Sequence, residues 1–90
     1  MHKWRKNRAP TNYPVTVTSG AFRQEASIVN ISEDGARLQD LAQFTVGAPL
    51  TIQAFGRNID ARVIWSKGDF TGVSFLSKLD QSTLTVIRRR

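Results

Sequence analysis

The stretch that decides the fold is LTIQAFGRNIDARVIWSKGDFTGVSFL, residues 50–76. Apolar and polar residues alternate in three short runs of it, and this period of two is typical of half-buried β-strands. Gly56-Arg57 separates the first run from the second, and residues 67–69 separate the second from the third. Because such turn residues join neighbouring antiparallel strands, the stretch predicts two consecutive β-hairpins.

The same alternation continues upstream of this stretch. It covers three further runs, which are residues 13–18, 23–31 and 36–39. Six short strands with no helix between them argue for an antiparallel sandwich or barrel. Closure into a barrel is favoured because it leaves no strand edge unpaired. We therefore expect an all-β fold, a six-stranded antiparallel β-barrel.

Several side chains are expected in particular places of this barrel. Alternation within residues 23–31 places Ile28 on one face of the sheet and Ile31 on the other. Trp65 and Phe75, at alternate positions in adjacent strands, are expected in the core. The longer connection at residues 40–48 is expected to cover one end of the barrel with its apolar residues, which are Leu41, Phe44 and Val46.

The pattern changes at both ends of the sequence. Residues 1–12 show no apolar periodicity and are interpreted as a flexible basic arm, so that residues 13–90 form the domain. After Leu76 the alternation stops, and Asp80 is a suitable N-cap. Leu84 and Ile87 then lie on one face of a short helix, at about residues 80–88.

Charge is concentrated at the two ends. The 90 residues carry a formal net charge of +6, and the basic residues gather in Lys3, Arg5, Lys6 and Arg8 and in Arg88, Arg89 and Arg90. This pattern predicts an anionic partner, which leaves nucleic acid, a nucleotide, acidic lipid or an acidic protein face open. The last three arginines also suit the negative end of a helix dipole.

Composition argues against several classes of function. The chain has no cysteine and a single histidine, His2, so metal sites and nucleophilic triads have little support, and we expect no enzyme. No apolar run is long enough to cross a membrane, and the N-terminus is too polar for a signal peptide. A cytoplasmic protein without membrane insertion is therefore expected.

Three segments together resemble a known family. Asn30-Ile31-Ser32-Glu33-Asp34-Gly35 matches the [D/N]xSxxG motif of the PilZ domain, and ARVIWSKGDFTGVSFL, residues 61–76, is similar to that family's last hairpin. The third segment is the basic arm ending at Arg8, followed by Pro14 and Val15. The resemblance covers nearly the whole chain. It implies a barrel of the split-barrel or Greek-key type with a C-terminal helix, and a receptor for cyclic di-GMP, a bacterial second messenger, without a further cofactor.

Residues 30–35 are the first part of the implied site. Asn30 and Ser32 are two apart on a strand, so their side chains are expected to leave on the same face and to reach one ligand edge. Gly35 permits positive φ in the turn and lets a ligand approach the backbone. The alternative for this hexapeptide is an Asx- or Ser-type turn, with glycine present for its geometry.

The basic arm is the second part. The family's arm motif is RxxxR; Arg8 aligns with its second arginine, Trp4 stands where the first belongs, and Arg5 follows one residue later. Because the planar guanidinium pairs with phosphate and with guanine, we expect Arg8 to clamp the ligand and Arg5 to assist. Trp4 is a candidate to stack on a guanine. Closure of the arm over the ligand would present a new surface to a downstream protein partner.

Two other readings of the sequence remain open. In one, the chain is a PilZ-like protein-interaction adaptor that does not bind cyclic di-GMP. In the other, it is a small basic barrel that binds nucleic acid, although only Tyr13, Phe22 and Phe70 are available for stacking on bases and the strand faces are not notably basic. We regard nucleic acid as the weaker of the two.

Overall fold

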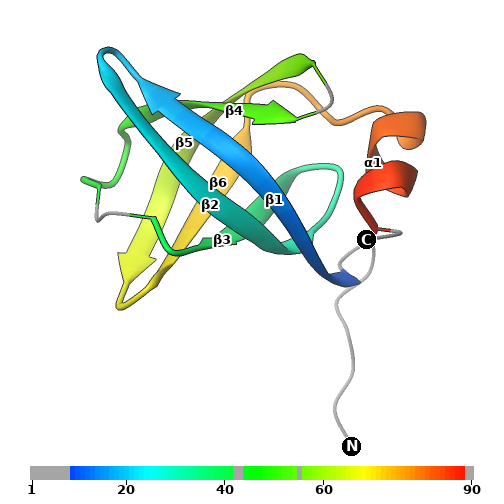
Figure 1. Cartoon of the computed structure of the whole chain (residues 1–90), viewed down its shortest axis with the longest axis horizontal. Helices are drawn as coiled ribbons and strands as arrows, with labels where there is room; N and C mark the ends of the chain where they lie inside the picture. The colour runs from blue at the N-terminus through cyan, green and yellow to red at the C-terminus, as the bar shows by residue number, and fades with distance from the viewer. Residues whose placement is uncertain (1–8, 42–43, 55, 89–90) are drawn as a thin grey trace, which may run out of the picture.

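A computed structural model describes residues 9–41, 44–54 and 56–88 of the chain. Six antiparallel strands close into a barrel in the order β1-β2-β3-β6-β5-β4, and one helix follows them (Figure 1). The elements are β1 (Ala9–Ser19), β2 (Phe22–Ile31), β3 (Gly35–Gln39), β4 (Pro49–Ala54), β5 (Arg57–Lys67), β6 (Phe70–Phe75) and α1 (Gln81–Arg88). The expected barrel with a short C-terminal helix is confirmed.

The interior of the barrel is filled by the apolar residues of the alternating runs. Val17, Ile28, Leu38 and Ile52, from four different strands, have no exposed surface. Each such side chain contributes about 1.5–3 kcal/mol by leaving water. The period of two in the sequence is therefore the pattern that directs these residues inward.

β1 begins earlier than the alternation indicates. The sequence pattern starts at Tyr13, whereas β1 starts at Ala9, which pairs with Ile31, and Pro10 pairs with Asn30. A bulge lies between Pro10 and Tyr13. The additional residues belong to the strand because they lie beside the end of β2, which apolar periodicity cannot reveal.

A second bulge changes the face on which Ile31 lies. Ile28 pairs with Leu38, and Asn30 pairs with Arg37, the residue directly before Leu38. Val29 is therefore an extra residue in β2 without a partner in β3. Ile31 is consequently buried in the core with Ile28, and its predicted position on the opposite face is wrong.

A third bulge places Trp65 outside the core. β5 and β6 change register between Val63 and Trp65, so that Ile64 is the extra residue and Trp65 pairs with Gly72. Trp65 remains 39% exposed, and its assignment to the core is wrong, whereas Phe75 is buried at 8% exposure as predicted.

The predictions for the connections between strands are confirmed only in part. Leu41 is buried and Phe44 packs edge-on against Phe22, but Val46 is 65% exposed and does not cover the barrel end. The β4–β5 hairpin has a tight connection, because Ala54 already pairs with Arg57. Arg57, predicted in the loop, is thus the first residue of β5.

Helix α1 lies beside the barrel end at which β1 begins (Figure 1). Leu84 and Ile87 are buried, as their helical spacing predicts. The Thr11 hydroxyl donates a hydrogen bond of 2.8 Å to the Ile87 carbonyl oxygen, so the last turn of the helix is attached to the first residues of β1.

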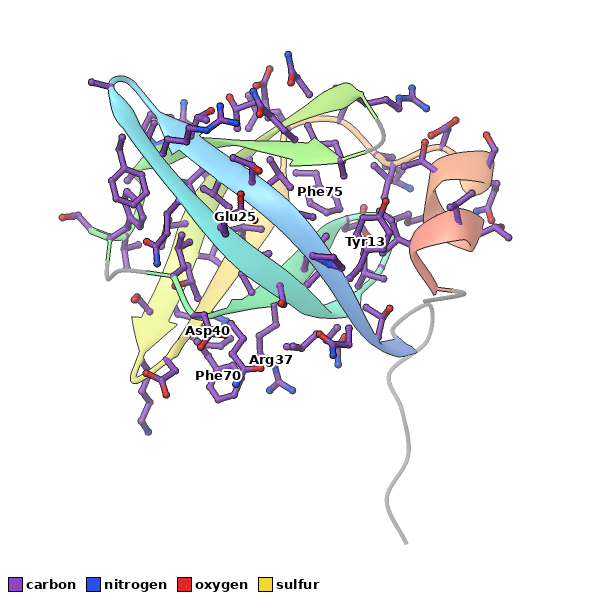
Figure 2. The ribbon with its side chains drawn as sticks, in the orientation of Figure 1. Tyr13, Glu25, Arg37, Asp40, Phe70 and Phe75 are labelled. Carbon is purple, nitrogen blue, oxygen red and sulfur yellow. The ribbon has the colours of Figure 1, made fainter. Side chains whose placement is uncertain are left out.

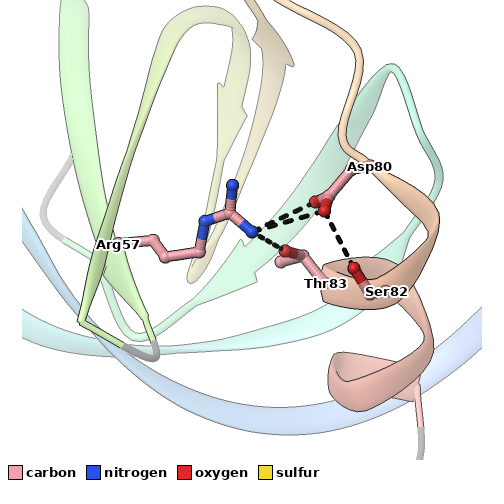
Figure 3. Close-up of polar contacts among 4 residues, drawn as sticks. All are labelled: Arg57, Asp80, Ser82 and Thr83. Atoms are coloured by element: carbon pink, nitrogen blue, oxygen red, sulfur yellow. Dashed lines mark hydrogen bonds and ion pairs between the residues drawn. The ribbon is translucent and has the colours of Figure 1, made fainter.

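The other end of α1 is held by a polar cluster (Figure 3). Arg57 donates to the Thr83 hydroxyl at 2.5 Å and to Asp80 Oδ1 at 3.3 Å, and Ser82 donates to Asp80 Oδ2 at 2.9 Å. Hydrogen bonds from Thr83 and Ser82, together with attraction by Arg57, lower the pKa of Asp80 from 3.8 to about 2. The carboxylate stands directly before the helix, as expected of an N-cap.

Candidate functional site

The turn at residues 32–35 follows directly after β2. The Ser32 amide donates to the Gly35 carbonyl oxygen at 2.9 Å, and the Ser32 hydroxyl accepts from the Asp34 amide at 3.3 Å. This is the Ser-type turn that the sequence allows. Ser32 lies beyond the end of β2, so strand alternation does not determine the direction of its side chain. The reason for expecting Ser32 and Asn30 on a shared face therefore does not apply.

Backbone hydrogen bonds attach this turn to the C-terminal part of the chain. The Asp34 carbonyl oxygen accepts from the Phe75 amide at 2.8 Å, at the end of β6. The Glu33 carbonyl oxygen accepts from the Leu79 amide at 2.8 Å, just before α1 begins. The turn is therefore fixed to β6 and to the segment that leads into the helix.

Gly35 is required by close packing and not by a left-handed backbone. Its φ angle is not positive, whereas those of four other described glycines are, namely Gly20, Gly47, Gly56 and Gly68. A Cβ atom at Gly35 would overlap the carbonyl oxygen of Val73 in the neighbouring strand. The predicted positive φ is thus wrong, while the need for glycine at this position has a different steric cause.

Four residues form a row across the barrel wall, which we call the outer row. Asn30 in β2 pairs with Arg37 in β3, Arg37 pairs with Gly72 in β6, and Gly72 pairs with Trp65 in β5. Arg37 and Trp65 are exposed, whereas Asn30 is 5% exposed. A Cβ atom at Gly72 would overlap the indole of Trp65, so the indole lies directly on the Gly72 backbone.

Arg37 is held in place by an aromatic ring on the same side of the sheet. Its guanidinium carbon lies 5.1 Å from the centroid of the Phe70 ring, a cation–π contact that Figure 2 shows at the outer surface of the barrel. The outer row therefore presents a guanidinium and an indole at the surface, with the buried Asn30 amide beside them. Aromatic faces and guanidinium groups suit a ligand that combines flat rings with anionic groups.

Sequence reasoning missed Arg37 and placed Trp65 in the wrong environment. The available signal is that Arg37 follows the motif by two residues and Gly72 follows Trp65 by seven. Arg37 pairs with Asn30 because of the bulge at Val29, and Trp65 pairs with Gly72 because of the bulge at Ile64. Alternation alone does not locate either bulge.

The predicted arm residues Trp4, Arg5 and Arg8 lie outside the described residues. The place from which that segment leaves is nevertheless fixed by β1. Ala9 pairs with Ile31, the residue that precedes Ser32, so the chain enters the barrel next to the turn. Two segments that are more than 20 residues apart in sequence thus meet at one end of the barrel.

The aromatic residues that a nucleic acid would need are mostly engaged. Tyr13 is buried in the core, Phe22 packs against Phe44, and Phe70 lies beneath Arg37. Three hollows in the described surface, of about 260, 230 and 470 Å³, are lined by residues 18–20, 46–47, 49–51, 57–64 and 74–80 and by none of residues 30–35.

Two further kinds of site are not found in this part of the chain. Across residues 9–41, 44–54 and 56–88, no cluster of three or more histidine, aspartate or glutamate side chains is arranged to hold a metal ion. Over the same ranges, no helix has the length and apolar character needed to span a membrane.

Comparison with known proteins gives a family and a fold. The sequence profile of the PilZ domain matches residues 3–90. A solved structure described as the crystal structure of the PilZ domain of CeSA from a cellulose-synthesizing bacterium is similar, with a TM-score of 0.65, 20% sequence identity and coverage of 92% of this chain and 91% of that one. At that identity the likeness concerns the fold alone. No curated protein sequence matches significantly.

Proposed function

Because the chain belongs to the PilZ domain family, we propose that it is a receptor for cyclic di-GMP, bound between the basic segment before Ala9 and the turn at residues 32–35. The observation that carries this proposal is the pairing of Ala9 with Ile31. It places the start of β1 beside the motif turn, and in the sequence Arg8 directly precedes that strand.

The chemistry of the basic segment suits both halves of the ligand. Cyclic di-GMP carries two phosphates and two guanines, and a guanidinium pairs bidentately with phosphate or with guanine O6 and N7. Arg8 clamps one of these groups and Arg5 assists. Trp4 offers an indole face on which a guanine stacks.

The barrel wall supplies the opposite side of the site. The Asn30 amide and the Ser32 hydroxyl are polar groups for the guanine edge and the phosphate, and Gly35 shapes the turn by letting it pack closely on β6. Arg37 extends this surface along the outer row with a second guanidinium. The Trp65 indole lies on the Gly72 backbone, next to Arg37, and offers a further stacking face.

Ligand binding orders the basic segment on the barrel, and the surface formed in this way is read by a protein partner. Hydrogen exchange of residues 2–8, which precede β1, tests this step. Saturating cyclic di-GMP is expected to raise the protection of these amides. Unchanged protection at saturation excludes closure of the segment, even if the ligand binds elsewhere.

Titration calorimetry with cyclic di-GMP tests the receptor function itself. Arg8→Ala is expected to remove most of the affinity and to leave the melting temperature unchanged, because the residue precedes the barrel. Arg23→Ala is the matched control, since it removes the same charge at the far end of the β1–β2 hairpin. Equal affinity of the wild type and Arg8→Ala would refute the role of Arg8.

A second candidate function is that of an adaptor that binds a protein and no nucleotide. Two observations favour it: the Ser32 hydroxyl is used inside its own turn, and the sequence contains no RxxxR pair. Calorimetry separates the two functions. Absence of heat on titration at tens of micromolar protein supports the adaptor.

A further inference from the structure

We infer that the largest of the three hollows in the described surface is the docking site of a partner protein that presents a carboxylate between apolar side chains. This apolar hollow has a volume of about 470 Å³ and is lined by Val46, Gly47, residues 62–64 and residues 74–76. The inference deepens the proposed function and rests on it in one respect, because the receptor and the adaptor both require a protein partner.

Three exposed apolar side chains border the apolar hollow. Val46, Ile64 and Leu76 each expose more than half of their surface, and they come from the β3–β4 connection, the bulge in β5 and the residue after β6. In the described part of the chain, only Trp65 and Val86 are further large apolar residues with this degree of exposure to water. A gathering of exposed apolar side chains marks an interaction site, because a partner that covers them removes their surface from water.

Arg62 is the only charged residue among the described residues that line the apolar hollow. Its guanidinium donates to the Gly47 carbonyl oxygen at 3.1 Å, which holds it at the border of the hollow. No carboxylate in the described ranges forms an ion pair with Arg62, and Asp60, two residues earlier, accepts from the Thr51 hydroxyl at 3.0 Å. The hollow therefore fits apolar side chains that carry a carboxylate beside them.

This single positive charge distinguishes between three kinds of occupant. In a symmetric dimer the same face of both copies meets, so two Arg62 side chains would share an interface whose described lining residues include no acid. Attachment to an anionic membrane relies on several cations that contribute about 1 kcal/mol each, and the hollow has one. A different protein places a carboxylate opposite Arg62, and arginine is one of the residues enriched in protein interfaces.

The apolar hollow is connected to the motif turn through β6. Ser74, which lines the hollow, pairs with Gly35, and the Phe75 amide donates to the Asp34 carbonyl oxygen at 2.8 Å. A partner in the hollow therefore contacts the strand to which the turn at residues 32–35 is attached. This position suits a protein that responds to the state of that turn.

Solution NMR of the full chain with two short peptides tests the charge of the partner. The probes are acetyl-Ala-Leu-Glu-Leu-Ala-amide and the same peptide with lysine in place of glutamate. We expect the glutamate peptide to shift the amide signals of residues 62–64 and 74–76 and to bind about three- to tenfold more tightly than the lysine peptide. Arg62→Glu is expected to reverse this preference, and Arg23→Glu, at the far end of the β1–β2 hairpin, to leave it unchanged.

Two further variants test the apolar part of the site. Leu76→Asn removes an exposed apolar side chain from the hollow and is expected to weaken binding of the glutamate peptide about fivefold. Val86→Asn makes a comparable change on α1, outside the hollow, and is expected to leave binding unchanged. Melting curves of all variants confirm that they fold.

Several outcomes overturn the inference. Equal binding of the two peptides by the wild type, or unchanged signals at residues 62–64 and 74–76, excludes the proposed partner. A dimer that Leu76→Asn dissociates in sedimentation assigns the hollow to a second copy, and cosedimentation with phosphatidylglycerol vesicles that Leu76→Asn abolishes assigns it to a membrane. The receptor function is decided separately, because absence of heat on titration with cyclic di-GMP overturns the receptor and leaves the docking site intact.

Discussion

Gly35 and Gly72 are positions at which a neighbouring group occupies the space of a side chain. At Gly35 that group is the carbonyl oxygen of Val73, a backbone atom that cannot move without disturbing the β3–β6 pairing. At Gly72 it is the Trp65 indole, which can rotate away. The two glycines therefore differ in how strictly they are required.

Replacement of Gly35 measures this packing. Gly35→Ala is expected to lower the free energy of unfolding by about 2–3 kcal/mol, because strand β6 has to shift. Gly20→Ala is the control: its Cβ meets no atom within 4 Å, but its φ of 61° is unfavourable, which costs about 1 kcal/mol. Denaturant unfolding gives both values, and a smaller loss for Gly35→Ala than for Gly20→Ala contradicts the steric explanation.

Thr71 has a buried hydroxyl with no hydrogen-bond partner among the described residues. Its side chain is fully buried, so Thr71→Val, which keeps the shape, is expected to leave stability unchanged or to raise it by up to about 1 kcal/mol. Thr83→Val makes the same chemical change where the hydroxyl accepts from Arg57, and it should cost about 1 kcal/mol. Thermal unfolding of both variants tests the contrast, and a greater loss in Thr71→Val opposes it.

At the scale of the elements, alternation predicts the strands but not their irregularities. The number of strands and the short helix could be predicted because apolar periodicity and the Asp80 cap are local properties of the sequence. The predicted positions of Ile31 and Trp65 are wrong because each residue follows a bulge. A bulge reverses the face of the sheet on which every later residue of the strand lies. A bulge depends on the pairing of two strands, which a single strand's sequence does not contain.

The start of α1 gives the protein a pH-dependent contribution to stability. The pKa of Asp80 is lowered from 3.8 to about 2, so its stabilising effect is complete above pH 3.8 and is lost as the pH falls towards 2. The difference in melting temperature between the wild type and Asp80→Asn is therefore expected to shrink over this range. Melting curves between about pH 5 and pH 2 measure it.

Glu25→Gln is the control for this experiment, because Glu25 is an exposed carboxylate on β2, away from the helix (Figure 2). Glu25→Gln thus measures the effect of removing one carboxylate charge without changing the start of α1. If the difference between the wild type and Asp80→Asn stays constant down to pH 2, the carboxylate does not stabilise the helix in its charged form.

At the scale of the whole molecule, the distribution of charge predicts a response to salt. Residues 9–88 carry seven basic and seven acidic side chains, so the net charge of +6 comes from the residues before Ala9 and after Arg88. The hydrogen bond between Thr11 and Ile87 holds the two ends of the described chain together, whereas the unfolded chain has a radius of gyration of roughly 30 Å and keeps its ends further apart. The basic residues attached to these two ends therefore repel one another more strongly in the folded protein. Salt screens the repulsion, so the melting temperature is expected to rise by about 2–4 °C between about 20 mM and about 300 mM NaCl. Arg89→Ala/Arg90→Ala should reduce this rise, and a fall in the melting temperature with salt would contradict it.

The candidate site could be predicted only as far as its residues are close in sequence. Asn30, Ser32 and Gly35 form a recognisable motif, and they lie around one turn of the structure. Arg37 and Trp65 join Asn30 through pairing between four strands, and this arrangement is visible only after the barrel is closed.

Closure of the barrel also limits how another protein can associate with this one. Neighbouring strands pair around the whole barrel. The pairing of β1 with β4 is short, because it involves only residues 16–18 of β1. The first half of β1 therefore has a neighbouring strand on one side only. That half contains Pro10 and Pro14, which have no amide hydrogen to donate, and α1 lies against it through Thr11. β-augmentation, in which a peptide extends a sheet at its edge, is therefore disfavoured, and recognition has to rely on side chains.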